Sequence, residues 1–165
     1  SREDGRLNGW RLNILATDID ETVMERGKAG VYSQFEVQRG MPIQLLVKYF
    51  AQQGDMWELD SAIRNLVRWQ KFNLLSSFAG IGRFDIIFCR NVLIYFDRQT
   101  KSEVLSRMAD ALEPDGYLVL GAAETVVGLS DRFEAQPNCR GLYRPVPRAG
   151  AQSAAPALRS IGQVA

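Results

Sequence analysis

The chain has 165 residues, long enough for one hydrophobic core, and its 46% apolar and 24% charged residues are ordinary for a globular domain. A net charge of +1 gives no reason to expect capture of nucleic acid or of an anionic membrane surface, and no apolar run approaches the roughly 18 residues of a membrane span. The sequence contains no histidine, which excludes Ser-His-Asp and Cys-His catalysis and His-ligated metal sites, and we expect no metal.

The N-terminal residues and the cysteines lead us to expect a cytoplasmic protein. The polar opening SREDGRLNGW has none of the features of a signal peptide. Cys89 and Cys139 are too few for a disulfide framework, and we expect both to be reduced, buried and hydrophobic in role.

The chain opens with a predicted strand followed by a helix. Residues 12–17 are apolar and compatible with a strand. Asp20 can cap a short helix that starts at Glu21 and ends near Gly27 or Gly30.

A second helix is predicted to begin at Pro42 and to stop at Gln53-Gly54. Its apolar residues recur at helical spacing: Ile43, Leu46, Val47 and Phe50. Between residues 56 and 72 the apolar pattern fits short strands better than a helix.

Residues 84–120 predict a strand, a helix and a parallel strand. FDIIFC at 84–89 reads as a fully buried strand, and Thr100-x-x-Glu103 has the pattern of a capping box. One face of the helix is apolar: Val104, Leu105, Met108, Ala109 and Leu112. Residues 114–116, Pro-Asp-Gly, predict a turn before the second strand at 117–120.

The last part of the chain predicts a hairpin and then a tail. Residues 131–145 can form a closing hairpin through Phe133 and Leu142-Tyr143. Residues 148–165 are rich in Ala, Gln, Ser and Pro and are expected to be a flexible tail or linker.

Polar residues follow the predicted strands: Asp18, then Asn73-Leu74, then Arg90-Asn91. Ligands of open α/β sheets bind at the carboxyl ends of the strands. A carboxylate can accept both hydroxyls of a ribose, an Asn can read an adenine edge, and an Arg can clamp a carboxylate. Together these residues suit a cofactor that contains adenosine, and we expect Arg90 and Asn91 to lie within contact distance of Asp18 across one cleft.

Each of these residues also has a simpler interpretation. Asp18 can be only a helix cap, and Asn73 only a turn residue. Arg90-Asn91 is harder to dismiss, because it precedes the apolar run Val92 to Phe96, where buried polar groups need partners. Tyr95 can equally be a core aromatic.

The segment FCRNVLIYFD at 88–97 resembles the CheR family of chemotaxis receptor glutamate methyltransferases. Further motifs extend the resemblance in order over about 130 residues: ILATDID (14–20), GVY (30–32), KYF (48–50), KFNLL (71–75), FDIIFCRNVLIYFD (84–97), LEPDGYLVLGAAE (112–124) and GLYR (141–144).

The resemblance implies an α/β fold: a Rossmann-like S-adenosylmethionine-dependent methyltransferase sheet with a small antiparallel β-subdomain as an insert. Residues 1–147 would form part of the catalytic domain, with 31–70 as the insert. The family's first strand and its glycine loop are absent, so we expect the chain alone to bind S-adenosylmethionine poorly. Gly121-Ala122-Ala123-Glu124 stands where the family commonly has Gly-His-Ser-Glu.

The resemblance also assigns roles to the strand-end residues. Asp18 would bind the ribose, Asn73 and Leu74 would line the adenosine end, and Arg90 and Asn91 would contact the cofactor near the reacting centre. Tyr95 would lie beside the transferred methyl group, so Tyr95 and Arg90 are the expected catalytic residues. A substrate glutamate is ionised at pH 7 and needs no general base, which agrees with the lack of histidine.

The implied partners are the cytoplasmic domains of methyl-accepting chemotaxis receptors, and the implied product of the cofactor is S-adenosyl-L-homocysteine. We expect no nucleic-acid partner and no direct membrane insertion. The insert carries Trp57 and Trp69 and would contact the receptor, with an antiparallel edge that can pair with an extended receptor segment, unless both tryptophans are simply its core. Two alternatives stay open: a fragment that docks receptors or senses cofactor without turnover, and a related methyltransferase with another carboxylate or a small-molecule substrate.

Overall fold

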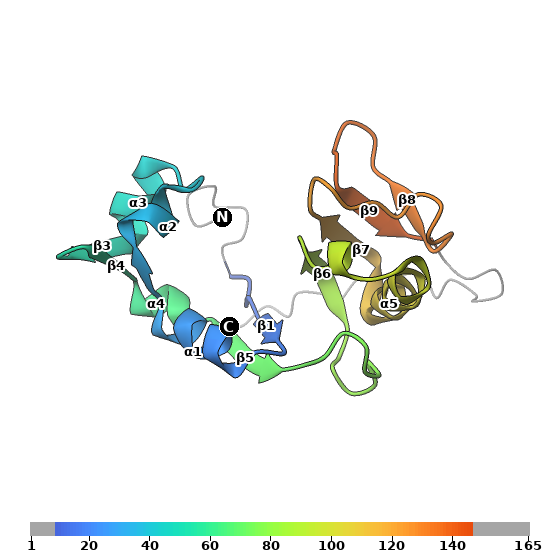
Figure 1. Ribbon diagram of the computed structural model, residues 1–165, viewed down its shortest axis with the longest axis horizontal. Coiled ribbons are helices and arrows are strands. Elements are labelled where there is room, and N and C mark those ends of the chain that lie inside the picture. Colours follow the sequence, from blue (N-terminus) through green and yellow to red (C-terminus); the bar gives the residue numbers. More distant parts are fainter. Residues whose placement is uncertain (1–8, 147–165) are drawn as a thin grey trace, which may run out of the picture. The chain divides into compact units, whose positions relative to one another are not determined.

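The computed structural model describes residues 9–146, which divide between two compact units, Ser1–Asn73 and Leu74–Ala165 (Figure 1). The predicted tail at 148–165 lies outside the described residues. Among residues 9–146, no helix has both the length and the apolar character needed to cross a membrane.

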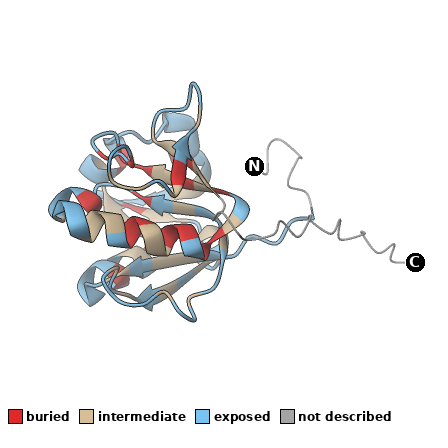
Figure 2. Cartoon of the chain, turned by 90° about the vertical axis from the view of Figure 1, so that its right-hand side faces the viewer, coloured by how far each residue is buried: buried red, intermediate tan, exposed pale blue. Residues whose placement is uncertain are grey.

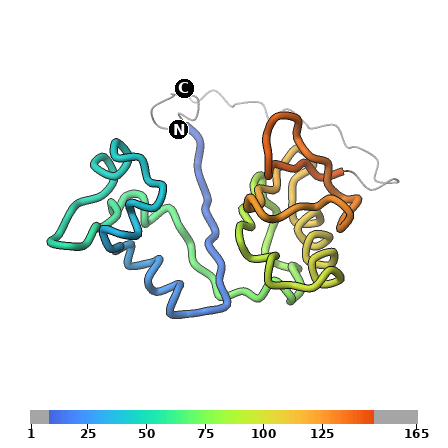
Figure 3. Tube along the Cα trace, turned by 45° about the horizontal axis from the view of Figure 1, so that its top comes forward, coloured from blue at the N-terminus to red at the C-terminus, as the bar shows by residue number. Residues whose placement is uncertain are grey.

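The first unit contains a parallel pair of strands joined to a helix. β1 (Ile14–Asp18) pairs with β5 (Val67–Lys71), and Asp18 stands opposite Lys71. α1 (Glu21–Ala29) follows β1, as Figure 3 shows in blue. Its cap is the predicted one, since Asp20 accepts hydrogen bonds from the N–H groups of the first turn, and Gly30 ends the helix at a φ of 66°.

α1 packs against β5 through a glycine. A Cβ added at Gly27 would overlap Cη2 of the Trp69 indole and would lie 2.7 Å from its Cζ3. The helix can therefore approach the strand this closely only where it has no side chain.

A small antiparallel sheet follows α1 along the chain. Its strand order is β2-β4-β3, with β2 (Val31–Ser33), β4 (Met56–Leu59) and β3 (Phe50–Gln53). Three short helices accompany it: α2 (Gln34–Gln38), α3 (Ile43–Tyr49) and α4 (Ser61–Arg64). The insert was expected to span residues 31–70. Its antiparallel strands end at Leu59, and the last residues of that range belong to β5, which pairs with β1.

The buried centre of this sheet consists of Val37, Leu46 and Trp57. The Trp57 indole N–H donates to Oε1 of Gln34 at 2.6 Å. The core interpretation is therefore correct for Trp57, whereas Trp69 packs beneath α1 instead.

The second predicted helix is shorter than its apolar pattern suggests. It ends at Tyr49, and the chain continues directly into β3. Gly54, which was expected to stop the helix, instead adopts a φ of 61° in the turn between β3 and β4. Pro42 is the cap residue of α3 and not part of its first turn.

The second unit has a four-stranded sheet in the order β6-β7-β9-β8. β6 (Phe84–Cys89) and β7 (Leu112–Leu120) are parallel and are connected through α5 (Arg98–Ala111), which confirms the predicted strand-helix-strand unit. β8 (Phe133–Ala135) and β9 (Leu142–Pro145) form the predicted closing hairpin.

α5 supplies most of the helical part of this unit's core, and its buried positions are visible in red along the helix in Figure 2. The predicted apolar face is confirmed, because all five of its residues are buried: Val104, Leu105, Met108, Ala109 and Leu112. They pack with Leu118 and Leu120 of β7 and with Tyr143 of β9.

Three predictions for the helix and the parallel strands of this unit are wrong. Thr100 and Glu103 form no capping box, because the cap of α5 is Asp97, whose Oδ1 accepts the Thr100 N–H at 2.8 Å. Residues 114–116 form no turn; they lie in β7, where the pairing with β6 is irregular between Phe84 and Ile86. β6 is also not fully buried: Phe88 is 71% exposed, because β6 is the edge strand of its sheet.

The two cysteines differ in their environment. Cys89 is buried at the end of β6, as predicted, but the prediction that Cys139 is also buried is wrong, because Cys139 is exposed. Burial, together with the charge of Glu124, raises the pKa of the Cys89 thiol to about 12.

Candidate functional site

In the first unit, Asp18 lies at the carboxyl end of the parallel strand pair. Its Oδ1 accepts the Asp20 N–H at 2.9 Å, and its carbonyl accepts the Phe72 N–H. Asn73 is the residue after Phe72, so the register brings Asp18 and Asn73 to the same end of the strand pair. A carboxylate has roughly four acceptor positions, so the local turn leaves Asp18 able to bind a ligand hydroxyl.

In the second unit, β6 is followed by a left-handed residue and a short 3₁₀ turn. Arg90 and Asn91 follow Cys89 directly, and Asn91 has a φ of 60°, which is uncommon for a residue other than glycine. A single turn of 3₁₀ helix, η1 (Leu93–Tyr95), comes next. Leu93 is 1% exposed and anchors this turn in the core.

The Glu124 carboxylate lies against this segment and accepts four main-chain N–H groups. Its Oε1 accepts from Val92 at 2.9 Å and from Leu93 at 2.8 Å. Its Oε2 accepts from Asn91 at 2.8 Å and from Gly121 at 2.7 Å. Glu124 is 8% exposed, so these bonds are shielded from water.

Burial opposes the ionisation of Glu124, but the N–H groups of Asn91, Gly121, Leu93 and Val92 outweigh it and lower the pKa of the carboxyl below its ordinary value of 4.5. The side chain is therefore an anion at neutral pH. The Glu124 carboxylate supplies the hydrogen-bond acceptors that the main-chain N–H groups of this segment would otherwise lack.

Gly121 is close to both sides of this arrangement. A Cβ placed there would lie 2.6 Å from Oε2 of Glu124 and 2.7 Å from Oδ1 of Asn91. Only a glycine fits between the carboxylate and the asparagine side chain.

Three residues of the predicted site at the end of β6 are exposed to solvent. Arg90 and Asn91 are exposed, and Tyr95 is 80% exposed, so the interpretation of Tyr95 as a core aromatic is wrong. A guanidinium and a phenol are thus presented at the carboxyl end of a parallel strand, on a main chain that Glu124 holds.

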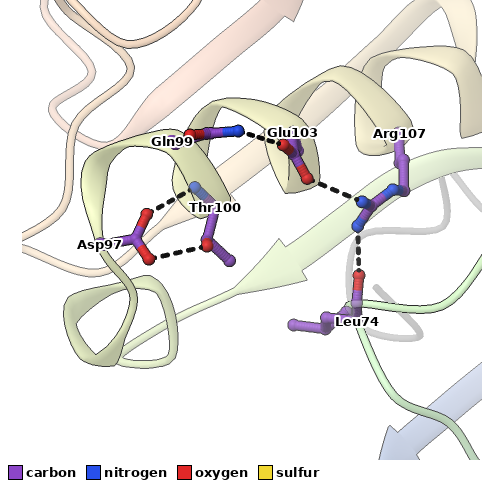
Figure 4. A network of polar contacts seen from close by, with 6 residues as sticks. All are labelled: Leu74, Asp97, Gln99, Thr100, Glu103 and Arg107. Carbon is purple, nitrogen blue, oxygen red and sulfur yellow. Dashed lines mark hydrogen bonds and ion pairs between the residues drawn. The ribbon is translucent and has the colours of Figure 1, made fainter.

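Leu74 is held by α5, as Figure 4 shows. Its carbonyl accepts a hydrogen bond from Nη1 of Arg107 at 2.9 Å, and Arg107 also bonds Glu103 at 3.3 Å. The Leu74 side chain packs against the core of the second unit. In the structure, the residue's position is fixed by these contacts, and its predicted place along an adenosine stays a prediction.

Glu124 was not identified from the sequence as a site residue. Its three partners in the 91–93 segment lie 31 to 33 positions away, so no local pattern reveals the contact. The available signal was a lone acid after the apolar strand YLVL, at a strand end where buried charge needs several donors.

Among residues 9–146, no three Cys, Asp or Glu side chains gather in a way that could hold a metal ion.

Curated relatives are chemotaxis methyltransferases. "Chemotaxis protein methyltransferase Cher2" of Pseudomonas putida is 44% identical over 122 residues, which is 73% of this chain and 44% of that protein. The chemotaxis protein methyltransferase of Vibrio parahaemolyticus is 44% identical over 124 residues, or 74% of this chain and 45% of that protein. The chain thus spans less than half the length of these relatives.

Among solved structures, PKMT2 from Rickettsia typhi in complex with AdoHcy has a TM-score of 0.42 at 18% identity, over 66% of this chain and 16% of that chain.

Residues 3–141 match the family described as "CheR methyltransferase, SAM binding domain". This match covers most of the chain, and it agrees with the observed α/β architecture and with the motifs at the ends of β1 and β6. The chain belongs to the CheR methyltransferase family, and its residues 3–141 match the S-adenosylmethionine-binding domain of that family.

Proposed function

We propose that this chain is the cofactor-binding part of an enzyme that methylates glutamate side chains of bacterial chemoreceptors in the cytoplasm. The observation that carries the proposal is the segment Arg90 to Tyr95, which has the family's motif and presents Arg90 and Tyr95 to solvent at a strand end.

The residues present fit the cofactor. Asp18 has acceptor capacity for the ribose hydroxyls, and Asn73 lies at the same strand end. Arg90 can hold the cofactor's carboxylate bidentately, and Asn91 can bind a neighbouring polar group. S-adenosylmethionine, when bound, supplies a methyl group on a sulfonium, which passes to a carboxylate oxygen as the C–O bond forms and the C–S bond breaks.

The chain's residues contribute alignment and not proton transfer. A glutamate has an ordinary pKa of about 4.3, so at pH 7 it is already the nucleophile. Tyr95 can orient the substrate carboxylate through its hydroxyl or face the cationic centre with its ring. Arg90 and Asn91 fix the other side of the reacting group, which is the kind of positioning that accelerates a two-reactant step.

The antiparallel sheet is the proposed receptor-docking element. Because its strand order is β2-β4-β3, the outer edge of β3 lacks a strand partner within residues 9–146. An extended receptor segment can add to such an edge. Trp57 contributes to the core beneath this sheet and not to the contact itself.

The test uses a full-length protein that contains this chain, with radiolabelled S-adenosylmethionine and a receptor cytoplasmic fragment. We expect base-labile methyl esters on the receptor, and none when the candidate glutamates of the receptor are replaced by alanine. Asp18→Asn and Arg90→Ala should each weaken binding of S-adenosylhomocysteine in calorimetry.

Two outcomes would contradict parts of the proposal. Cofactor binding without ester formation would support a docking or sensing role instead of an enzyme. Removal of the β3–β4 turn around Gly54 without an effect on receptor binding would exclude docking through this sheet.

A further inference from the structure

The contact between Glu124 and the segment at 91–93 is the most completely satisfied polar arrangement around the candidate site. Three consecutive main-chain N–H groups, from Asn91, Val92 and Leu93, converge on one carboxylate, and the Gly121 N–H adds a fourth. Glu124 is the one charged or polar residue found buried among residues 9–146.

This contact stabilises a main-chain conformation that is unfavourable on its own. Asn91 adopts a left-handed φ of 60°, which costs free energy for a residue with a side chain. Four short hydrogen bonds to an anion offset that cost, and the buried Leu93 fixes the following turn. The residues on either side of this anchored stretch are Arg90 and Tyr95.

We propose that Glu124 is a positioning residue for methyl transfer: by binding the N–H groups of Asn91 to Leu93 it holds the main chain that carries Arg90, Asn91 and Tyr95. The inference rests on the proposed function and adds to it a residue that touches neither cofactor nor substrate. Its role is to keep the guanidinium, amide and phenol in one geometry.

The carboxylate is needed as an anion with two equivalent oxygens. Oε1 serves Val92 and Leu93, and Oε2 serves Asn91 and Gly121. In Glu124→Gln an amide NH2 group takes the place of one of these oxygens. Its N–H donors then face two main-chain N–H donors, and those two main-chain groups lose their acceptor. Glu124→Asp keeps the anion but shortens the reach by one methylene.

The Cys89 thiol is a titratable neighbour of Glu124: burial first, and then the charge of Glu124, raise its pKa. Burial keeps that thiol neutral at pH 7, so Glu124 is the group of this pair that ionises near the acid end of the pH range.

The first measurement needs no substitution. In the 165-residue chain, amide proton shifts of Asn91, Val92, Leu93 and Gly121 should titrate together, with one midpoint below 4.5, as the carboxylate is protonated. Independent titration of these amides while the chain is folded would overturn the shared contact.

The second measurement compares hydrogen exchange in Glu124→Gln, Glu124→Asp and a matched control, Glu113→Gln. Glu113 is the second residue of β7, at the opposite end of the strand from Glu124, and its carboxylate pairs with Arg83. We expect exchange at Asn91 to Leu93 to accelerate by about tenfold or more in Glu124→Gln, less in Glu124→Asp, and not at all in the control.

The third measurement is turnover in a full-length protein that contains this chain. We expect Glu124→Gln to lower kcat by about tenfold or more with a smaller change in the receptor KM, and Glu124→Asp to recover part of the loss. Accelerated exchange with unchanged turnover would overturn the positioning role. If the unsubstituted protein makes no methyl ester, the proposed function fails, while the titration and exchange results still decide whether Glu124 holds the segment.

Discussion

At the scale of single residues, the one-turn helix η1 has a buried residue, Leu93, at its start and an exposed phenol, Tyr95, at its end. Leu93 is 1% exposed at its start and Tyr95 is 80% exposed at its end. Leu93 allows the phenol to project from the protein without losing its place, because a buried neighbour two residues away defines the local main chain.

Replacing Tyr95 with Phe tests the assigned role of the phenol. In a full-length protein that contains this chain, we expect kcat to fall while the affinity for S-adenosylhomocysteine changes little, because a contact made in the transition state appears in the rate. Steady-state kinetics and calorimetry measure the two effects. Unchanged turnover would remove the Tyr95 hydroxyl from the mechanism.

At the scale of elements, the packing of α1 on β5 reverses the usual effect of replacing a helical glycine with alanine. Replacing a helical glycine with alanine usually stabilises a protein by roughly 0.5–1 kcal/mol. At Gly27 the added methyl group would overlap the Trp69 ring, and overpacking of this kind costs about 1–3 kcal/mol.

We therefore expect Gly27→Ala to lower the free energy of unfolding, measured by urea denaturation. The control is the double variant with Trp69→Leu, in which the ring is absent and Gly27→Ala should become neutral or stabilising relative to Trp69→Leu alone. A stabilising effect in the unsubstituted background would contradict the observed closeness.

The cap of α5 gives a prediction about pH. The Thr100 N–H holds the pKa of the Asp97 carboxyl below its ordinary value of 3.8. Because the pKa is lowered in the folded state, the charge contributes stability above the unfolded-state pKa, and the contribution is lost as the pH falls through the folded-state value.

Asp97→Asn keeps a capping oxygen but removes the ionisation. We expect the difference in Tm between the original chain and Asp97→Asn to be present at pH 6 and to shrink as the pH falls below 3.8 and the folded-state carboxylate is protonated. Thermal unfolding followed by circular dichroism at several pH values measures this difference. A difference that stays constant across this range would show that the carboxylate charge has no part in the cap.

The elements that the sequence predicted well have local causes. The apolar runs at 84–89 and 117–120 and the face from Val104 to Leu112 each determine a strand or a helix face without outside help. The errors arise where two local signals compete: Asp97 caps α5 in preference to Thr100, and Gly54 serves a hairpin that the helical spacing before it concealed. Glu124 was missed because its partners are distant in sequence.

At the scale of the whole molecule, the two units have hydrophobic clusters of very different extent. In the second unit the buried cluster includes α5, β7, β9 and the end of β6. In the first unit the antiparallel sheet is supported by Val37, Leu46 and Trp57 with two partly buried aromatic residues. Cores of different size should open at different free energies.

We expect amides of α5 and β7 to exchange at least about tenfold more slowly than those of α2 and α3 under native conditions. Hydrogen exchange followed by mass spectrometry measures this, with peptides from Val104 to Leu120 compared with peptides from Gln34 to Tyr49. Equal protection in both sets would mean that the two units unfold as one.

The contrast between the two cysteines makes the chain suitable for labelling with a single probe. The thiol of Cys89 is buried and stays protonated at neutral pH, whereas Cys139 is exposed in the connection between β8 and β9. A maleimide dye or spin label should therefore attach at Cys139 alone in the native protein, without removal of any cysteine. Cys89 would then react only when the end of β6 opens. The rate at which a second thiol becomes labelled therefore measures local unfolding beside the Glu124 contact.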